Sequence, residues 1–127
     1  VDTSGSVSTQ ELEYFAGCLN DVLTRAKPKR TYVVYCDAEI AKQGGVQEYT
    51  PGQEIDFRPV GRGGTDFRPP FARAAREGWP LAAAIYLTDL EGPFPDREPD
   101  YPVLWVATSK AKAPWGETHE LVVPGRA

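Results

Sequence analysis

The spacing of apolar residues predicts one long helix near the start of the chain. Between Ser8 and Ala26 these residues recur at steps of three and four, which places them on one face of a helix. Ser8 and Glu11 fit a capping box, in which each side chain bonds the backbone N–H of the other residue. Pro28 should end the helix, because proline disfavours a helical conformation in the residue before it. We therefore expect a helix over residues 8–26.

Later apolar runs predict strands that are covered on both faces. The runs near residues 31–36, 83–88 and 103–107 lack the strict alternation of a half-exposed strand. Residues 46–49 alternate like a short edge strand, and residues 120–123 are expected to form the last strand.

A second helix is predicted over residues 70–77. Pro69 and Pro70 suit a helix start, where missing N–H donors are tolerated, and Gly78 suits its end. Strands that alternate with helices predict an α/β fold. We expect a doubly wound, mostly parallel, Rossmann-like sheet with helices on both faces.

Composition narrows the class of protein. The 127 residues suit a single domain spanning 1–127. The chain has 14 basic and 18 acidic side chains, evenly spread, with a net charge of -4, which argues against a nucleic-acid-binding arm or a basic membrane patch. Cys18 and Cys36 lie in apolar stretches and are expected to be reduced thiols in the core. The polar turn directly after Val1 suggests a piece of a longer protein with a truncated first strand.

Three polar junctions should meet at one edge of the predicted sheet, because ligands gather at the carboxyl ends of parallel strands. The first is residues 2–6, where Asp2, Ser4 and Ser6 alternate on a turn that opens into a helix. Thr65 and Asp89, in the other two junctions, could complete the set. Carboxylate and hydroxyl oxygens suit a hard cation such as Mg²⁺, which would keep open or water-filled positions here.

These motifs resemble the metal-ion-dependent adhesion site of von Willebrand factor type A (VWA) domains. The resemblance rests on an Asp-x-Ser-x-Ser string at residues 2–6, followed by Thr65 and then Asp89, and it covers nearly the whole chain. It implies that Mg²⁺ or Mn²⁺ is held by Asp2, Ser4, Ser6, Thr65 and Asp89, with Asp89 often acting through water.

Three further segments are similar to bacterial VWA-like domains found at the carboxyl end of predicted metallopeptidases. They are residues 36–39, 61–69 and 114–116. That similarity implies a protein-binding role beside a separate peptidase-like domain, in the bacterial cytoplasm, with an AAA+ ATPase as one possible partner. The expected ligand on the partner is an Asp or Glu carboxylate, and neither nucleic acid nor membrane is expected to bind.

Other polar residues near the predicted site have two interpretations each. Asp37 could accept hydrogen bonds behind the site or simply turn the chain, and we favour the turn. Asp66 is better suited to accept N–H groups at a helix start than to bind metal. Arg62 and Arg68 could attract an acidic partner or lie solvated, whereas for Arg73 and Arg76 we favour a solvated helix face.

We expect this domain not to be an enzyme, although a metal-dependent hydrolase and a metal-independent interaction domain are alternatives. The turn at Asp2 superficially resembles that of haloacid-dehalogenase phosphatases, which carry an acid two residues after the nucleophilic Asp. Ser4 stands there instead. Without that general acid, phosphoryl transfer through Asp2 is poorly supported.

Overall fold

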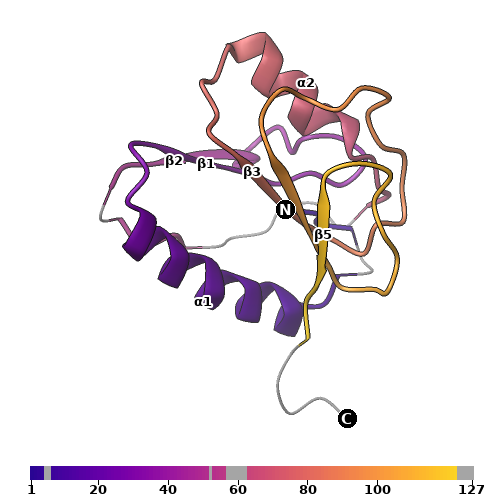
Figure 1. The fold of residues 1–127 in the computed structure, drawn as a ribbon, viewed down its shortest axis with the longest axis horizontal. Coiled ribbons are helices and arrows are strands. Elements are labelled where there is room, and N and C mark those ends of the chain that lie inside the picture. The colour runs from indigo at the N-terminus through magenta and orange to yellow at the C-terminus, as the bar shows by residue number, and fades with distance from the viewer. Residues whose placement is uncertain (5–6, 52, 57–62, 123–127) are drawn as a thin grey trace.

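A computed structural model describes residues 1–4, 7–51, 53–56 and 63–122, and all structural statements below concern those residues. It contains two helices and five strands (Figure 1). The elements are α1 (Thr9–Ala26), β1 (Thr31–Val34), β2 (Val46–Tyr49), α2 (Arg68–Glu77), β3 (Ala84–Thr88), β4 (Val103–Ala107) and β5 (Glu117–Glu120). Neither helix of the described chain is long and apolar enough to cross a membrane.

The strands form two sheets. β1 and β2 pair antiparallel, whereas β3, β4 and β5 form a parallel sheet in that order. The amino-terminal segment lies between the two sheets. The Thr3 N–H donates to the Cys36 carbonyl at 3.0 Å, and the Asp2 N–H donates to the Leu87 carbonyl at 2.8 Å. The chain is thus an α/β structure in which Asp2 is anchored on both sides.

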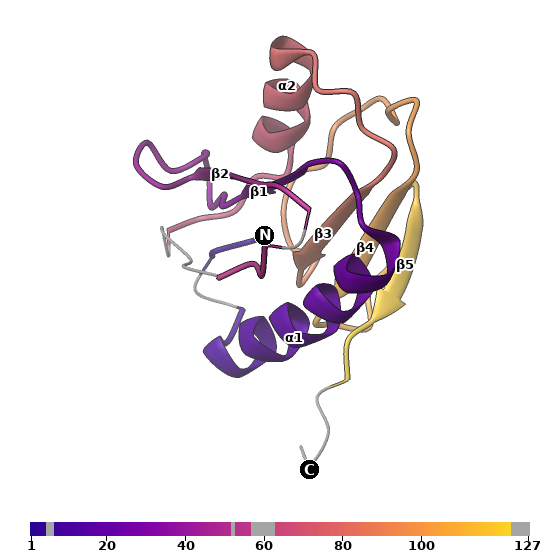
Figure 2. The same cartoon turned by 90° about the vertical axis from the view of Figure 1, so that its left-hand side faces the viewer.

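The helices lie on opposite sides of the strands (Figure 2). α1 packs Leu12 and Phe15 against Leu87 of β3. On the other side, Phe71 of α2 packs against an aromatic cluster that includes Tyr86 and Trp105. Side chains of neighbouring residues point to opposite faces of a strand. This is why Tyr86 and Leu87 contribute to different cores.

The predicted helices form with small differences. Ser8 and Glu11 make the expected capping box at the start of α1. α2 begins at Arg68 rather than at residue 70, and both prolines lie in its first turn, where their missing N–H groups leave no bond unmade. Gly78 ends α2 in the left-handed conformation, with φ of 65°.

Two sequence-based predictions are wrong. The last strand is β5 at Glu117–Glu120 and not residues 120–123, because Glu120 already pairs with Ala107, the last residue of β4. The Leu121 N–H still donates to the Ala107 carbonyl, residues 121–122 lie outside the strand, and residue 123 lies outside the described residues. Cys18 is exposed on α1 rather than in the core, whereas Cys36 is buried, and both are free thiols.

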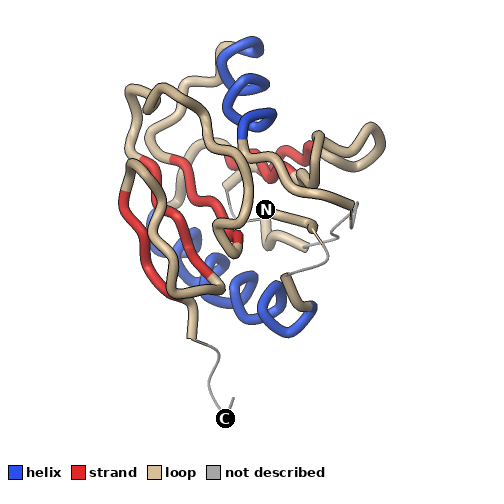
Figure 3. Tube along the Cα trace, turned by 90° about the vertical axis from the view of Figure 1, so that its right-hand side faces the viewer, coloured by secondary structure: helices blue, strands red, loops and turns tan. Residues whose placement is uncertain are grey.

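Figure 3 shows that long loops connect β3 to β4 and β4 to β5, with no helix in either connection. The first of these loops is held by tryptophans. Trp115 Nε1 donates to the Pro95 carbonyl and Trp105 Nε1 donates to the Trp115 carbonyl, both at 3.0 Å. The loop that follows Asp89 is therefore fixed against the aromatic cluster.

Candidate metal centre

Asp2 lies at the centre of the candidate site and is fully buried. Its Oδ1 accepts the Ser4 N–H at 2.8 Å, and its Oδ2 accepts the Thr88 hydroxyl at 2.6 Å. The Thr88 hydroxyl in turn accepts the Leu90 N–H at 3.1 Å. Thr88 therefore links the end of β3 to the amino-terminal turn and holds the Asp2 carboxylate in one orientation.

Asp89 directly follows Thr88, and only 7% of its surface is exposed. Its Oδ1 accepts the Glu91 N–H at 3.0 Å, and its backbone carbonyl accepts the Ser109 hydroxyl at 2.7 Å. The hydrogen bond between Thr88 and Asp2 brings the two acidic residues to the same edge, although they are far apart in sequence. Ser4, with 3% exposure, belongs to the same buried turn.

The loop that carries Thr65 packs against the loop that follows Asp89. The Phe67 N–H donates to the Pro93 carbonyl at 3.0 Å. A Cβ added at Gly92 would lie 2.8 Å from Thr65 Cγ2, so only glycine leaves room for Thr65 there. Asp2, Ser4, Thr65 and Asp89 therefore lie on segments that converge at the carboxyl end of β3, as the strand-end rule predicts.

The two buried carboxylates lack a cationic side chain as a partner in the part of the chain that the structure describes. Within the described ranges, no Lys, Arg or His forms an ion pair with Asp2 or Asp89. The hydroxyl oxygen of Thr3, also fully buried, has no hydrogen-bond partner there. The described chain holds no group of three or more His, Cys, Asp and Glu side chains that could bind a metal, so any metal site here depends on hydroxyl ligands as well as carboxylates.

Asp37 turns the chain after β1, as favoured from the sequence, and also holds the loop that leads to Thr65. Its Oδ1 accepts the Glu39 N–H at 3.2 Å and its Oδ2 accepts the Gly63 N–H at 3.0 Å. Partial desolvation acts to raise the pKa of Asp37, but the backbone N–H donors outweigh it and lower the pKa below its ordinary value. Asp37 is thus an ionised anchor for the Thr65 loop.

Asp66 pairs with Arg68 at the start of α2. The guanidinium group donates from Nε at 3.0 Å and from Nη2 at 2.8 Å, and the Arg68 N–H adds a bond of 2.9 Å. The side-chain hydrogen bonds from Arg68 lower the pKa of Asp66. The prediction that Asp66 accepts an N–H at a helix start is confirmed, and Arg68 is engaged in this pair.

The buried thiol of Cys36 connects these loops. Its Sγ donates toward the Asp66 carbonyl at 3.4 Å and the Asp37 carbonyl at 3.5 Å. Burial raises the pKa of Cys36 to about 12. The thiol is therefore a neutral donor at neutral pH, packed beneath the two loops.

Some predicted site residues fall outside the described ranges, and one described residue was missed. Ser6 and Arg62 lie outside the described residues. The predicted ligand set does not include Thr88, yet this residue orients Asp2. A hydroxyl residue at the end of an apolar strand, directly before an acidic residue, is the signal that could have identified it.

The chain matches a family model over residues 1–122, and the model is described as VWA-like domain (DUF2201). The protein therefore belongs to this VWA-like family. Domains of this class are generally interaction modules rather than enzymes. Comparison with curated proteins and with solved structures yields no match.

Proposed function

We propose that this domain is a divalent-metal-dependent protein-binding module. The metal, Mg²⁺ or Mn²⁺, would be held by Asp2, Ser4, Ser6, Thr65 and Asp89. When bound, it would supply a positive charge with an exchangeable position for a carboxylate oxygen from a partner's Asp or Glu. An AAA+ ATPase is a candidate partner, and a peptidase-like domain of the same bacterial, cytoplasmic protein is the proposed context.

The observation that carries the proposal is the pair of buried carboxylates without a cationic side chain as a partner in the described chain. A carboxylate removed from water is costly unless it is paired or bound to a metal. Asp2 and Asp89 receive three hydrogen bonds from backbone N–H and hydroxyl groups, but no Lys, Arg or His side chain of the described residues pairs with them. The buried amino group of Val1 interacts with Asp2, but desolvation lowers its pKa to about 6. The side-chain atoms that would bind the metal are all carboxylate or hydroxyl oxygens, which a hard cation prefers. The residues present therefore fit Mg²⁺ or Mn²⁺.

The chain's own residues would act mainly by orientation. Thr88 and the Ser4 N–H fix the Asp2 carboxylate, while the Glu91 N–H fixes Asp89. Gly92 leaves space for Thr65, and Asp37 anchors the loop on which Thr65 lies. Such preorganisation reduces the entropy lost when a ligand binds.

We also propose that the two sheets form one doubly wound, Rossmann-like layer. The nitrogen of Val1 donates to the Val34 carbonyl at 2.8 Å, and Asp2 forms a parallel bridge with Cys36. Together with the bond from Asp2 to Leu87, this supports a central first strand between β1 and β3. Asp2 would then lie at the carboxyl end of that strand, where such folds bind ligands.

Affinity capture tests the proposed binding role. The immobilised domain, loaded with Mn²⁺, should retain a protein from extracts of its source organism that EDTA releases, and Asp2→Asn should retain none of it. Glu91→Gln is the matched control, since Glu91 is an exposed carboxylate two residues from Asp89. Equal retention by wild type and Asp2→Asn, with or without EDTA, would favour a metal-independent interaction domain.

A further inference from the structure

A groove lies between α2 and the loop that joins β1 to β2. It has a volume of about 370 Å³. Four residues of α2, spaced three and four apart, share the face that lines it: Pro69, Ala72, Arg73 and Arg76. The opposite wall is the turn at residues 40–42. The groove thus differs from the candidate metal centre, because Asp2, Ser4, Thr65 and Asp89, the described members of the proposed ligand set, do not line it.

Three cationic side chains line this groove on a chain that is acidic overall. Arg73 forms an ion pair with Glu77, in which Arg73 Nε lies 3.2 Å from Glu77 Oε1. The Arg73 side chain is one-third exposed. Lys42 and Arg76 form no ion pair within the described ranges. Since Glu77 offsets one of the three charges, the groove keeps a surplus of positive charge. The predicted solvated helix face agrees with the structure, because Arg73 pairs with the neighbouring Glu77 and Arg76 is exposed.

The wall formed by residues 40–42 is tightly anchored. Tyr35 donates its N–H to the Gly45 carbonyl at 2.7 Å, and Ala41 donates its N–H to the Tyr35 carbonyl at 3.2 Å. A Cβ at residue 45 would lie 2.1 Å from the Ala41 carbonyl oxygen, so only glycine permits this close turn. This wall of the groove is therefore held in place within its own turn, which lowers the entropic cost of binding there.

We propose that this groove binds a short acidic segment of a partner protein without help from a metal. Ile40, Ala41 and Ala72 would contact apolar side chains of the segment, while Lys42 and Arg76 would engage its carboxylates. A single nucleic-acid strand is a poorer fit, since no aromatic side chain among the described residues lines the groove to stack on a base. The chain's net charge of -4 would also repel the parts of a nucleic-acid strand that extend beyond the groove.

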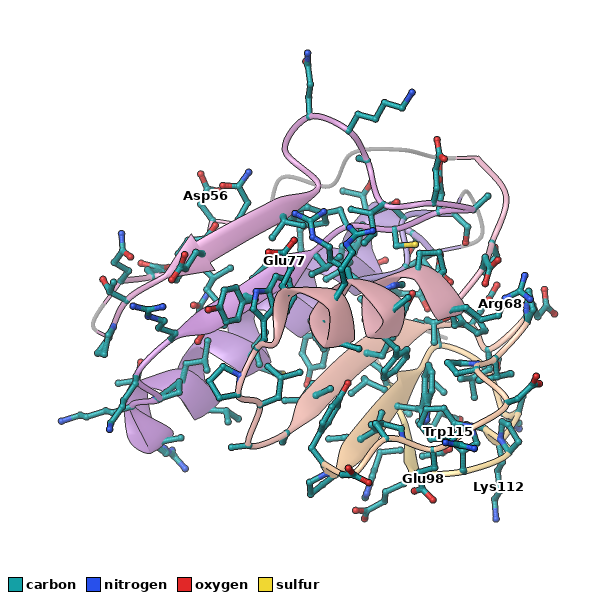
Figure 4. All side chains as sticks on the ribbon, turned by 90° about the horizontal axis from the view of Figure 1, so that it is seen from above. Asp56, Arg68, Glu77, Glu98, Lys112 and Trp115 are labelled. Carbon is teal, nitrogen blue, oxygen red and sulfur yellow. The ribbon has the colours of Figure 1, made fainter. Side chains whose placement is uncertain are left out.

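Fluorescence anisotropy with a labelled peptide of alternating glutamate and leucine tests this inference. The domain should bind the peptide in EDTA as well as in Mn²⁺, and the double variant Lys42→Gln, Arg76→Gln should bind it roughly tenfold more weakly. A double variant Lys110→Gln, Lys112→Gln removes the same charge elsewhere. Figure 4 shows Lys112 on the opposite side of α2 from the loop that joins β1 and β2, and Glu77 and Arg68 near the two ends of that helix.

The control variant should bind the peptide as wild type does, and a glutamine–leucine peptide should not bind. Equal weakening in both double variants would reduce the effect to general electrostatics and overturn the proposal. Full competition by inorganic phosphate would assign the groove to small anions, and full competition by polyuridylate would assign it to nucleic acid. Loss of binding in EDTA would place the peptide at the metal centre, and each of these results contradicts an independent acidic-peptide site.

Discussion

Two pairs of acidic residues near the carboxyl end of β3 differ in their burial and in their partners. Asp37 and Asp66, the surface pair, are partly exposed to solvent. Asp37 accepts backbone N–H groups, and Asp66 pairs with a guanidinium group. Asp2 and Asp89 are more deeply buried and have no cationic side chain as a partner within the described chain. Solvent and Arg68 therefore compensate the negative charges of the surface pair, whereas the buried pair has neither solvent nor a cationic side chain beside it in the described residues.

This difference separates a structural role from a binding role. The bonds of the surface pair hold the Thr65 loop and the start of α2 in place. The bonds of the buried pair orient carboxylates without neutralising them. A residue kept in such an environment lowers stability unless a ligand compensates it, which is a common feature of functional sites.

The largest effect is expected for Thr88→Val. This change leaves both Asp2 Oδ2 and the Leu90 N–H without their partner in a buried place. Each such loss costs about 1–3 kcal/mol, so the free energy of unfolding should fall by about 3 kcal/mol. Urea unfolding measures the loss, and Thr88→Ser, which keeps the hydroxyl, should lose about 1 kcal/mol. Equal losses in the two variants would mean that the hydroxyl does not organise the buried pair.

An intermediate effect is expected for Gly92→Ala. The new methyl group would lie 2.8 Å from Thr65 Cγ2 and 3.2 Å from the buried ring of Phe67. Overpacking should lower the free energy of unfolding by about 1–2 kcal/mol and weaken Mn²⁺ binding as Thr65 moves. Gly17→Ala is the matched control. No atom lies within 4 Å of the added Cβ on exposed α1, so it should stabilise the protein by about 0.5–1 kcal/mol without changing Mn²⁺ affinity.

The smallest effect is expected for Arg68→Gln, which removes the cation of the surface pair. The Arg68 side chain is 60% exposed, so solvent screening keeps the loss of stability small. Arg68 lowers the pKa of Asp66 in the folded state, so the pair stabilises the protein above the unfolded Asp pKa of about 3.9. That contribution is lost as the pH falls through the lower, folded pKa.

Urea unfolding of wild type and Arg68→Gln at a series of pH values checks this. The difference between the two proteins should be present at about pH 6 and should shrink as the pH falls below the unfolded Asp pKa of about 3.9. A difference that persists in acid would show that Arg68 stabilises the helix by packing rather than by its charge.

How well the sequence predicts each feature depends on how local its cause is. α1 was predicted well because its capping box and apolar spacing act within the helix itself. The meeting of Asp2 with the end of β3 was also expected, since it follows from parallel strand ends. The position of β5 was not, because it depends on where β4 ends. Likewise, the groove beside α2 requires the turn at residues 40–42, which no helix pattern reveals.

Calorimetric titration with Mn²⁺, comparing Asp2→Asn with Asp66→Asn, tests the central claim most directly. Both changes remove one negative charge at nearly constant shape, one from the buried pair and one from the surface pair. Wild type and Asp66→Asn should bind one Mn²⁺ with similar affinity, and Asp2→Asn should show no binding heat. Unchanged Mn²⁺ binding in Asp2→Asn would contradict the account, as would a loss of binding in Asp66→Asn alone.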